Sequence, residues 1–190
     1  MADKPARDVN VNAVPQNLEA EQFLLGCILL DDNLAQELVP TLKAEDFYAP
    51  SHRILLSAMQ KVLNESKPID FVTVADALDR SGQLAAAGGI NYLTTLNTVV
   101  PSSANYRVYL KIVERNSVLR ALIRAGTSII EECRNSDDEE RSVAFAEKAV
   151  YDISDKKQSG DLTPVGESTG EVLTTVSYTH LRAHETGAYL

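Results

Sequence analysis

The sequence predicts an all-α fold: a globular head of several helices, followed by a long antiparallel helical hairpin and a linker helix. Apolar residues recur at helical spacing in most segments, and strand-like alternation never lasts more than a few residues. Between residues 104 and 134 the chain has no proline and a single glycine, Gly126, which leaves room for an unusually long helix. Of the 190 residues, 44% are hydrophobic and 24% are charged, a composition that can build a buried core.

Residues 1–14 are polar and without periodicity, and we expect them to form a disordered arm. Asn17 can cap a helix whose first turn carries Glu19 and Glu21, where the helix dipole favours anions. This helix is apolar on nearly all sides over residues 23–30, so we expect it at the centre of the head. The same run is far shorter than a bilayer span and no secretory signal precedes it, so neither a membrane segment nor a membrane partner is expected.

The rest of the head, to residue 102, is expected to hold four shorter helices separated by polar, glycine and proline breaks. They are predicted at 31–40, 51–64, 73–81 and 90–100. Thr73 and Asp76 form a loose capping box for the third of these helices. Phe47 and Tyr48 lie in a turn and are expected to be exposed, and His52 is expected to cap a helix or to face solvent.

The hairpin is predicted over residues 103–157. Its long first helix ends at a polar turn, 135–138. A row of apolar residues at heptad spacing is predicted to face inward from the second helix: Val143, Ala146, Val150 and Ile153. Residues 156–161 have the composition of a flexible linker, so 158–176 are assigned to a linker and the start of a further helix.

Charge is unevenly placed along the hairpin. Residues 103–130 carry five basic residues and one acidic residue, whereas residues 131–155 carry nine acidic and three basic residues. Neighbouring segments of opposite charge favour two antiparallel helices that pair about a turn centred near residue 137. This register places Arg124 near Val150, one turn from Glu147 and Asp152, and it places Arg120 near Ser154 and Asp155. The alternative is that each charge only solvates an outer face.

No residues for catalysis, cofactor binding or metal binding are predicted. None of the glycines is followed by lysine, so the phosphate-binding loop of ATPases is absent, and no His/Cys cluster has metal-ligand spacing. Cys27 and Cys133 are far apart and are expected to be reduced and buried. This chain alone is therefore not expected to be an enzyme.

Residues 177–190 resemble a translated sequencing adapter, and the native sequence is expected to continue differently after Val176. This tail contains His180 and His184, but the zinc-protease pattern requires Glu where Leu181 stands. No metal site is therefore expected there.

A series of short motifs carries a family resemblance. The motifs are Pro15–Gln22, Gly26–Asp31, Asp46–Tyr48, His52–Arg53, Pro68–Asp70, Gly88–Gly89 and Pro101–Asn105. Together they resemble the N-terminal domain of bacterial replicative DNA helicases of the DnaB type, over about residues 15–176. The resemblance implies a helical head, a hairpin, and a linker whose helix docks on the motor domain of a neighbouring subunit.

The resemblance also implies a function. In the family, a C-terminal RecA-like domain uses ATP and Mg²⁺, binds single-stranded DNA and unwinds the duplex 5'–3'; that domain is missing from this chain. The N-terminal domains pair through their hairpins, form a collar on a hexameric ring and dock primase, and in some bacteria they contribute to binding the helicase loader. The implied location is the replisome in the bacterial cytoplasm.

The residues expected at the self-association surface lie on the first hairpin helix. They are an apolar row that the second helix leaves uncovered, with two basic neighbours: Tyr106, Leu110, Val113, Arg120 and Arg124. Two other functions are weighed against the collar. One is a helical regulatory or adaptor domain unrelated to replication, which the motif series disfavours. The other is a small DNA-binding domain using Lys111, Arg115, Arg120 and Arg124, which the net charge of −9 and the lack of a helix-turn-helix signature disfavour.

Overall fold

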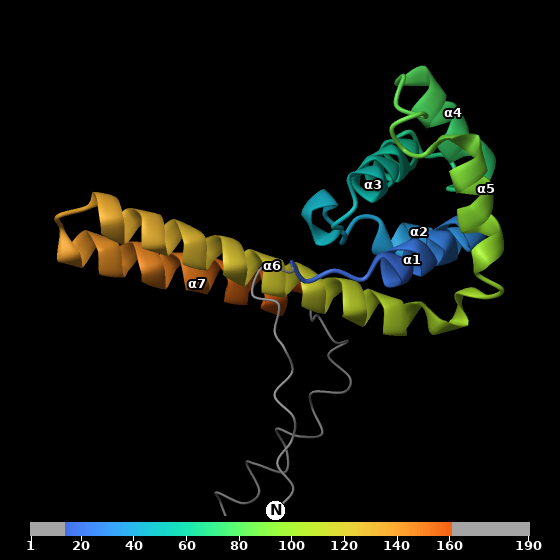
Figure 1. Ribbon diagram of the computed structural model, residues 1–190. Coiled ribbons are helices and arrows are strands. Elements are labelled where there is room, and N and C mark those ends of the chain that lie inside the picture. The colour runs from blue at the N-terminus through green and yellow to red at the C-terminus, as the bar shows by residue number, and fades with distance from the viewer. Residues whose placement is uncertain (1–13, 161–190) are drawn as a thin grey trace, which may run out of the picture.

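The computed structural model describes residues 14–160, and within that range every regular element is a helix (Figure 1). The predicted all-α class is therefore confirmed. The head contains α1 (Leu18–Leu30), α2 (Asp32–Leu38), the 3-10 helix η1 (Ala44–Asp46), α3 (Pro50–Asn64), α4 (Phe71–Arg80) and α5 (Gly89–Val99). A second 3-10 helix, η2 (Ser103–Asn105), leads to α6 (Tyr106–Asn135) and α7 (Glu139–Gly160). The predicted arm before residue 14, the linker over 161–176 and the tail over 177–190 lie outside the described residues.

Helix α1 lies at the centre of the head, as its apolar sequence predicts. The Asn17 side chain accepts a hydrogen bond of 2.9 Å from the Ala20 amide and so caps the helix. Most of the helix is buried, and it contacts α2, α3, α5 and α6. The contact with α5 is close, because a Cβ atom added at Gly26 would lie 2.7 Å from the Leu96 carbonyl oxygen. Glycine is therefore required where these two helices approach each other.

Local capping explains where the other head helices begin. The capping box of α4 is formed by Asp70 and Thr73, not by Thr73 and Asp76 as predicted: the Thr73 amide donates to Asp70 Oδ1 at 2.8 Å and the Asp70 amide donates to Thr73 Oγ1 at 3.0 Å. The helix begins at residue 71, earlier than predicted, so Thr73 is already inside it. Gly88, with φ of 104°, precedes α5 in the left-handed region that glycine favours.

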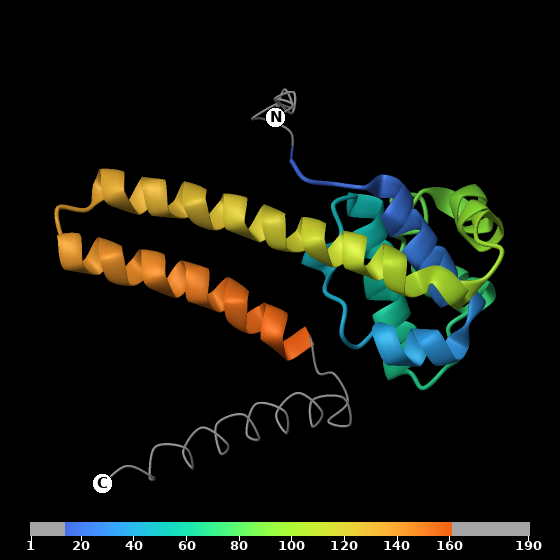
Figure 2. The ribbon, with the colours of Figure 1, turned by 90° about the horizontal axis from the view of Figure 1, so that it is seen from below.

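Helix α6 is 30 residues long and belongs to both parts of the molecule. Its first half lies against the head, and its second half runs beside α7, which returns antiparallel (Figures 1 and 2). Helix α7 extends to Gly160, beyond the predicted boundary at residue 157, so residues 156–160 are helical and not linker. Lys156, Lys157 and Gln158 are good helix formers that continue an existing helix readily, and the helix ends at the poor helix former Gly160.

Candidate functional site

The two hairpin helices meet along a seam of mostly small side chains. The half-buried residues on α7 are Ser142, Ala146, Ala149 and Ile153, and their counterparts on α6 include Ala121, Ala125 and Ile129. The predicted inward row is thus only half right, because Val143 and Val150 are 53% and 48% exposed. Alanine side chains let the two helices approach closely. Ala149 therefore occupies the heptad position that was predicted for Val150, and both Val143 and Val150 lie outside the seam.

Beside the seam runs a band of exposed apolar side chains, which we call the hairpin face. It consists of Leu119, Leu122 and Ile130 of α6 and Val143 and Val150 of α7, each between 41% and 53% exposed. Helical periodicity places all five on the same flank of the hairpin. Cys133 and Val143 line one shallow hollow near the turn, which supports this placement. Cys133 is exposed, contrary to the expectation that both cysteines are buried.

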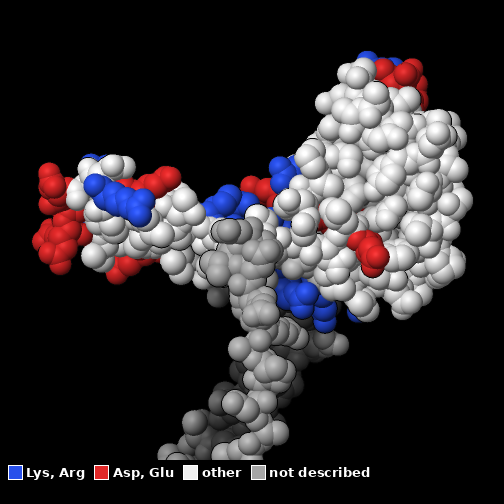
Figure 3. Space-filling model, in the orientation of Figure 1, with Lys and Arg blue, Asp and Glu red and all other residues white. Residues whose placement is uncertain are grey.

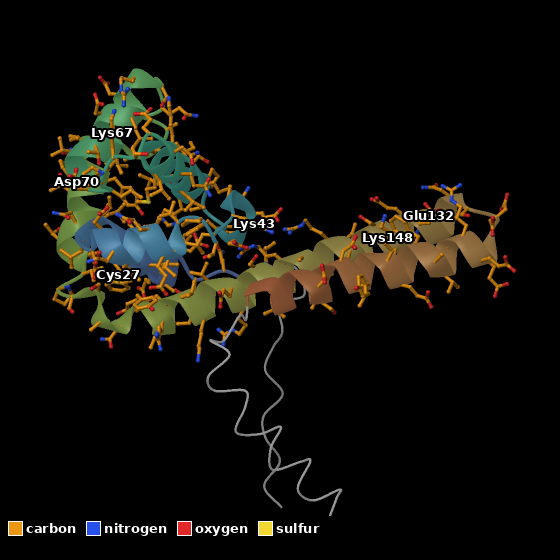
Figure 4. The ribbon with its side chains drawn as sticks, turned by 180° about the vertical axis from the view of Figure 1, so that it is seen from behind. Cys27, Lys43, Lys67, Asp70, Glu132 and Lys148 are labelled. Atoms are coloured by element: carbon orange, nitrogen blue, oxygen red, sulfur yellow. The ribbon has the colours of Figure 1, made fainter. Side chains whose placement is uncertain are left out.

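One ion pair spans the two helices close to the turn. Nε of Arg141, on α7, lies 3.1 Å from Oε1 of Glu132, on α6. The midpoint of these two positions is close to residue 137, where the sequence places the turn, but both residues belong to the segment 131–155, and here the acid is on α6 and the base on α7. The predicted pair of Arg124 with Glu147 is absent from the described part of the chain. Instead, acidic side chains gather at the tip of the hairpin (Figure 3), and Glu132 lies near that tip (Figure 4).

The predicted self-association row packs within the chain. Val113 is 1% exposed, and Tyr106 and Leu110 are half-buried against the core of the head. The rings of Phe23 and Tyr109 stack at 5.0 Å between centroids in the same contact. The sequence analysis did not anticipate that α1 packs against α6 in this region. Further along, the hairpin face carries apolar residues that the head does not cover.

Arg120 also belongs to the interior of the molecule. It is 3% exposed, and its guanidinium donates to the carbonyl oxygens of Pro15 at 2.9 Å, Asp46 at 2.7 Å and Glu45 at 3.4 Å. One turn earlier, Ser117 Oγ donates to Asp46 Oδ1 at 2.7 Å. The expected neighbours of Arg120 on α7 are therefore replaced by the head. Arg124 remains exposed on α6.

A buried polar chain joins α1, α3 and α5. Glu21 is 1% exposed and accepts hydrogen bonds from the amides of Tyr48 at 2.7 Å and Ala49 at 3.3 Å. Its Oε2 atom lies 2.7 Å from His52 Nδ1, and His52 Nε2 lies 2.6 Å from the Tyr92 hydroxyl. Burial by itself raises the pKa of the Glu21 carboxyl, but the hydrogen bonds from His52 and from the two amides outweigh it, so the pKa is lowered. The carboxylate thus stays ionised inside the head.

The sequence analysis expects Phe47 and Tyr48 to be exposed and His52 to cap a helix or face solvent. His52 is 2% exposed and Phe47 is fully buried, so the expectations for both were wrong. The segment after η1 is drawn inward because the Glu21 carboxylate holds its amides. A usable signal was present: Glu21 shares a helical face with Leu24, Leu25 and Ile28, which predicts a buried side chain.

The described residues 14–160 contain no group of three or more His, Cys, Asp or Glu side chains that could hold a metal ion. In the same range no helix is long and apolar enough to cross a membrane. The two features of this part of the chain that bear on function are the hairpin face and the polar groups that attach the head to α6.

Comparison with known proteins agrees with the motif series. The replicative DNA helicase DnaB of Geobacillus stearothermophilus is 36% identical over 172 residues, and the match covers 90% of this chain but 38% of that protein. The replicative DNA helicase DnaC of Bacillus subtilis (strain 168) is 38% identical over 152 residues, covering 80% of this chain and 34% of the relative. This chain thus spans little more than a third of these relatives.

Solved structures give the same fold. The crystal structure of the N-terminal domain of DnaB helicase from Mycobacterium tuberculosis matches with a TM-score of 0.69 and 36% identity, over 74% of this chain and 99% of that one. A DnaB-like replicative helicase, solved to describe its interactions with primase, matches in fold with a TM-score of 0.57 at 23% identity, over 83% of this chain and 35% of that one. Residues 13–115 match the family of the DnaB-like helicase N terminal domain. The chain belongs to that family.

Proposed function

We propose that this chain is the N-terminal collar domain of a hexameric bacterial replicative DNA helicase and that it self-associates through the hairpin face. The observation that carries this proposal is the hairpin face, a band of exposed Leu, Ile and Val side chains along one flank of α6 and α7. Contiguous apolar surface of this kind marks protein–protein interfaces. A two-fold axis beside the hairpin would pair the band with its own copy, as isologous dimers do, and would produce a four-helix bundle.

The free energy of association expected from the hairpin face fits a collar better than an isolated tight dimer. Burying a large aliphatic side chain completely contributes roughly 1.5–3 kcal/mol, so the ten half-exposed side chains of two hairpin faces contribute on the order of 10 kcal/mol. Association costs about 4–15 kcal/mol in lost freedom. A pair held by this face alone is therefore weak, and further contacts within a ring would reinforce it.

Docking of primase is proposed for the head. Residues 81–106 contain no charged side chain, and most of the visible head surface on the side of α5 is uncharged (Figure 3). On α5, the hydroxyls of Thr94, Thr95 and Thr98 donate to helix carbonyls, which leaves their methyl groups available at the exposed surface. Such a surface suits a partner recognised by shape and apolar contact. The family resemblance also makes the helicase loader a candidate partner of the collar.

The motor function is proposed for the intact protein and not for this chain. The relatives are replicative helicases, and the family resemblance assigns ATP, Mg²⁺, most contacts with DNA and 5'–3' unwinding to a domain outside this sequence. The chain itself, with a head over 15–102 and a hairpin from 103, would supply assembly and recruitment at the bacterial cytoplasmic replisome. The adaptor alternative finds no support in the comparisons, and burial of Arg120 removes one of the four bases of the DNA-binding alternative.

Sedimentation velocity of charge-introducing variants tests the interface. Ile130→Asp and Val143→Asp alter the hairpin face, and each is expected to weaken self-association at least ~10-fold, which corresponds to about 1.4 kcal/mol. Tyr151→Asp is the matched control, because Tyr151 is 67% exposed on α7 and lies on the side away from the seam. Equal weakening in all three variants, or none in Ile130→Asp, would place the interface elsewhere.

A further inference from the structure

Helix α6 is attached to the head at two separate places. The first is apolar and ends at Val113, where the half-buried aromatic Tyr109 stacks on the ring of Phe23. The second is polar and is made by Ser117 and Arg120. Beyond Arg120 no residue of α6 is buried, so the rest of this helix, to its end at residue 135, projects from the head together with α7.

The polar attachment holds the segment between the end of η1 and the start of α3. Residues 45–49 comprise the end of η1 and the connection to α3, and their backbone groups are bound by side chains from several elements. Arg120 donates to the carbonyls at 45 and 46, Arg53 donates to the carbonyl of Phe47 at 2.8 Å, and Glu21 accepts from the next two amides. This segment therefore connects α6 mechanically to α1 and α3. The bond from Arg120 to the Pro15 carbonyl ties the start of α1 to the same point.

The burial of Arg120 is poorly explained by a contribution to folding stability alone. A buried guanidinium loses hydration, and its Nε atom has no hydrogen-bond partner. Burial lowers the pKa of Arg120, and the neighbouring Arg124 and Arg53 act in the same direction against Glu21 and Asp46. What Arg120 does supply is a rigid planar fork that reaches several carbonyls at once, which the flexible single ammonium of lysine cannot reproduce.

We infer that Arg120 is a positioning residue that fixes the angle between the head and the hairpin. Without the polar attachment, α6 could rotate relative to the head about the apolar contact near Val113 as a pivot. The hydrogen bonds of Arg120, two turns further along, prevent this rotation. The hairpin tip at Asn135 lies about 33 Å from the pivot at 1.5 Å per residue, so a rotation of about 10° moves the tip on the order of 6 Å. This inference concerns the geometry of a single chain and goes beyond the proposed collar function, because it holds whether or not the hairpins pair.

Pulsed electron paramagnetic resonance on the full chain tests the inference. Spin labels at Glu37→Cys in the head and Glu140→Cys in the hairpin, both exposed, report the intrachain distance in a Cys133→Ser background, with Cys27 buried and labelled molecules diluted in unlabelled protein. Arg120→Met is expected to shift or broaden the distance distribution on the order of 5 Å. It is also expected to raise amide exchange in residues 44–49 more than in the buried part of α1.

The matched control is Arg124→Met, one turn along α6 and exposed, which is expected to leave the distribution unchanged. Arg120→Lys keeps the charge but loses the fork, and it is expected to behave like Arg120→Met. If Arg120→Met does not fold, Arg120→Lys and Ser117→Ala are judged by the same distances. A distribution identical to that of Arg124→Met, with helical circular dichroism retained, would overturn the inference.

Discussion

Nδ1 of His52 lies 2.7 Å from Oε2 of Glu21, and both side chains are almost completely buried between α1 and α3. The residues are 31 positions apart, and their contact sets how α3 sits against the central helix. Through Tyr92 the same chain of polar groups reaches α5. The head is thus held by a polar connection at its centre as well as by apolar packing.

Glu21→Gln is expected to lower the free energy of unfolding of the head. It is also expected to make this free energy less dependent on pH in the acid range. The pKa of Glu21 is lowered in the folded state, so its stabilising contribution is present above the unfolded-state pKa of about 4.3 and is lost as pH falls through the lower folded-state pKa. Loss of the buried charge beside His52 should cost about 3 kcal/mol near neutral pH. Urea unfolding between pH 3 and pH 7 measures both effects. Glu19→Gln, an exposed acid in the same first turn, serves as the control and is expected to change stability by less than about 1 kcal/mol.

Val113→Ala is expected to lower the free energy of unfolding by about 1–3 kcal/mol, because it empties space between α6 and the head. Self-association measured at concentrations where the protein remains folded should not change. Val143→Ala, on the half-exposed hairpin face, is expected to alter monomer stability by no more than about 0.5 kcal/mol. Chemical denaturation paired with sedimentation separates the two effects. A loss of dimer in Val113→Ala without a loss of stability would contradict this assignment.

The two cysteines are expected to differ strongly in reactivity. Cys133 is exposed, whereas burial raises the pKa of the Cys27 thiol to about 11. Because the thiolate is the reactive species, a thiol reagent at pH 8 should modify one group quickly and the other only as the protein unfolds. Cys133→Ser should abolish the fast phase and keep the slow one. Two fast phases in the native wild-type protein would show that α1 is not buried as described.

The pair of Glu132 and Arg141 is expected to couple weakly, by roughly 0.2–1 kcal/mol, and less at high salt. A double-mutant cycle with alanine substitutions measures this coupling in the free energy of unfolding. The same cycle on Arg124 and Glu147 is the control and should give none. Since the pair lies within one hairpin, its coupling should persist when Ile130→Asp weakens association.

Much of the helix order was predictable because local signals punctuate the chain. Asn17 caps α1 with its own side chain, Gly88 supplies a backbone angle that other residues avoid, and the apolar run of residues 23–30 marked the central helix. These features act over a few residues, so a single sequence displays them. The extension of α7 to Gly160 was missed because helix propensity was given less weight than linker-like composition.

The partners of the buried charged side chains were not predictable in the same way, even though the helical face of Glu21 indicated its burial. Arg120 meets the Pro15 carbonyl across 105 positions, and the burial of Glu21 depends on amides 27 and 28 positions away. Charged residues are usually exposed, so which groups compensate their buried charge follows from contacts that the fold creates. The hairpin face was misplaced for a related reason. Periodicity gives apolar rows on α6, but the assignment of a row to the head or to a partner requires knowing how far the head reaches.

The uninterrupted length of α6 restricts how the family can vary. Each residue of an α-helix advances the chain by about 100° and 1.5 Å. A single insertion or deletion between Arg120 and Ala125 would therefore turn the seam for α7 by about a quarter of a circle relative to the head. The angle about the helix axis between two faces of α6 would then change: the face that carries Val113 and Arg120, and the face that meets α7. Related sequences are thus free to exchange many side chains in this stretch, but alignment gaps there should occur only in steps close to whole turns.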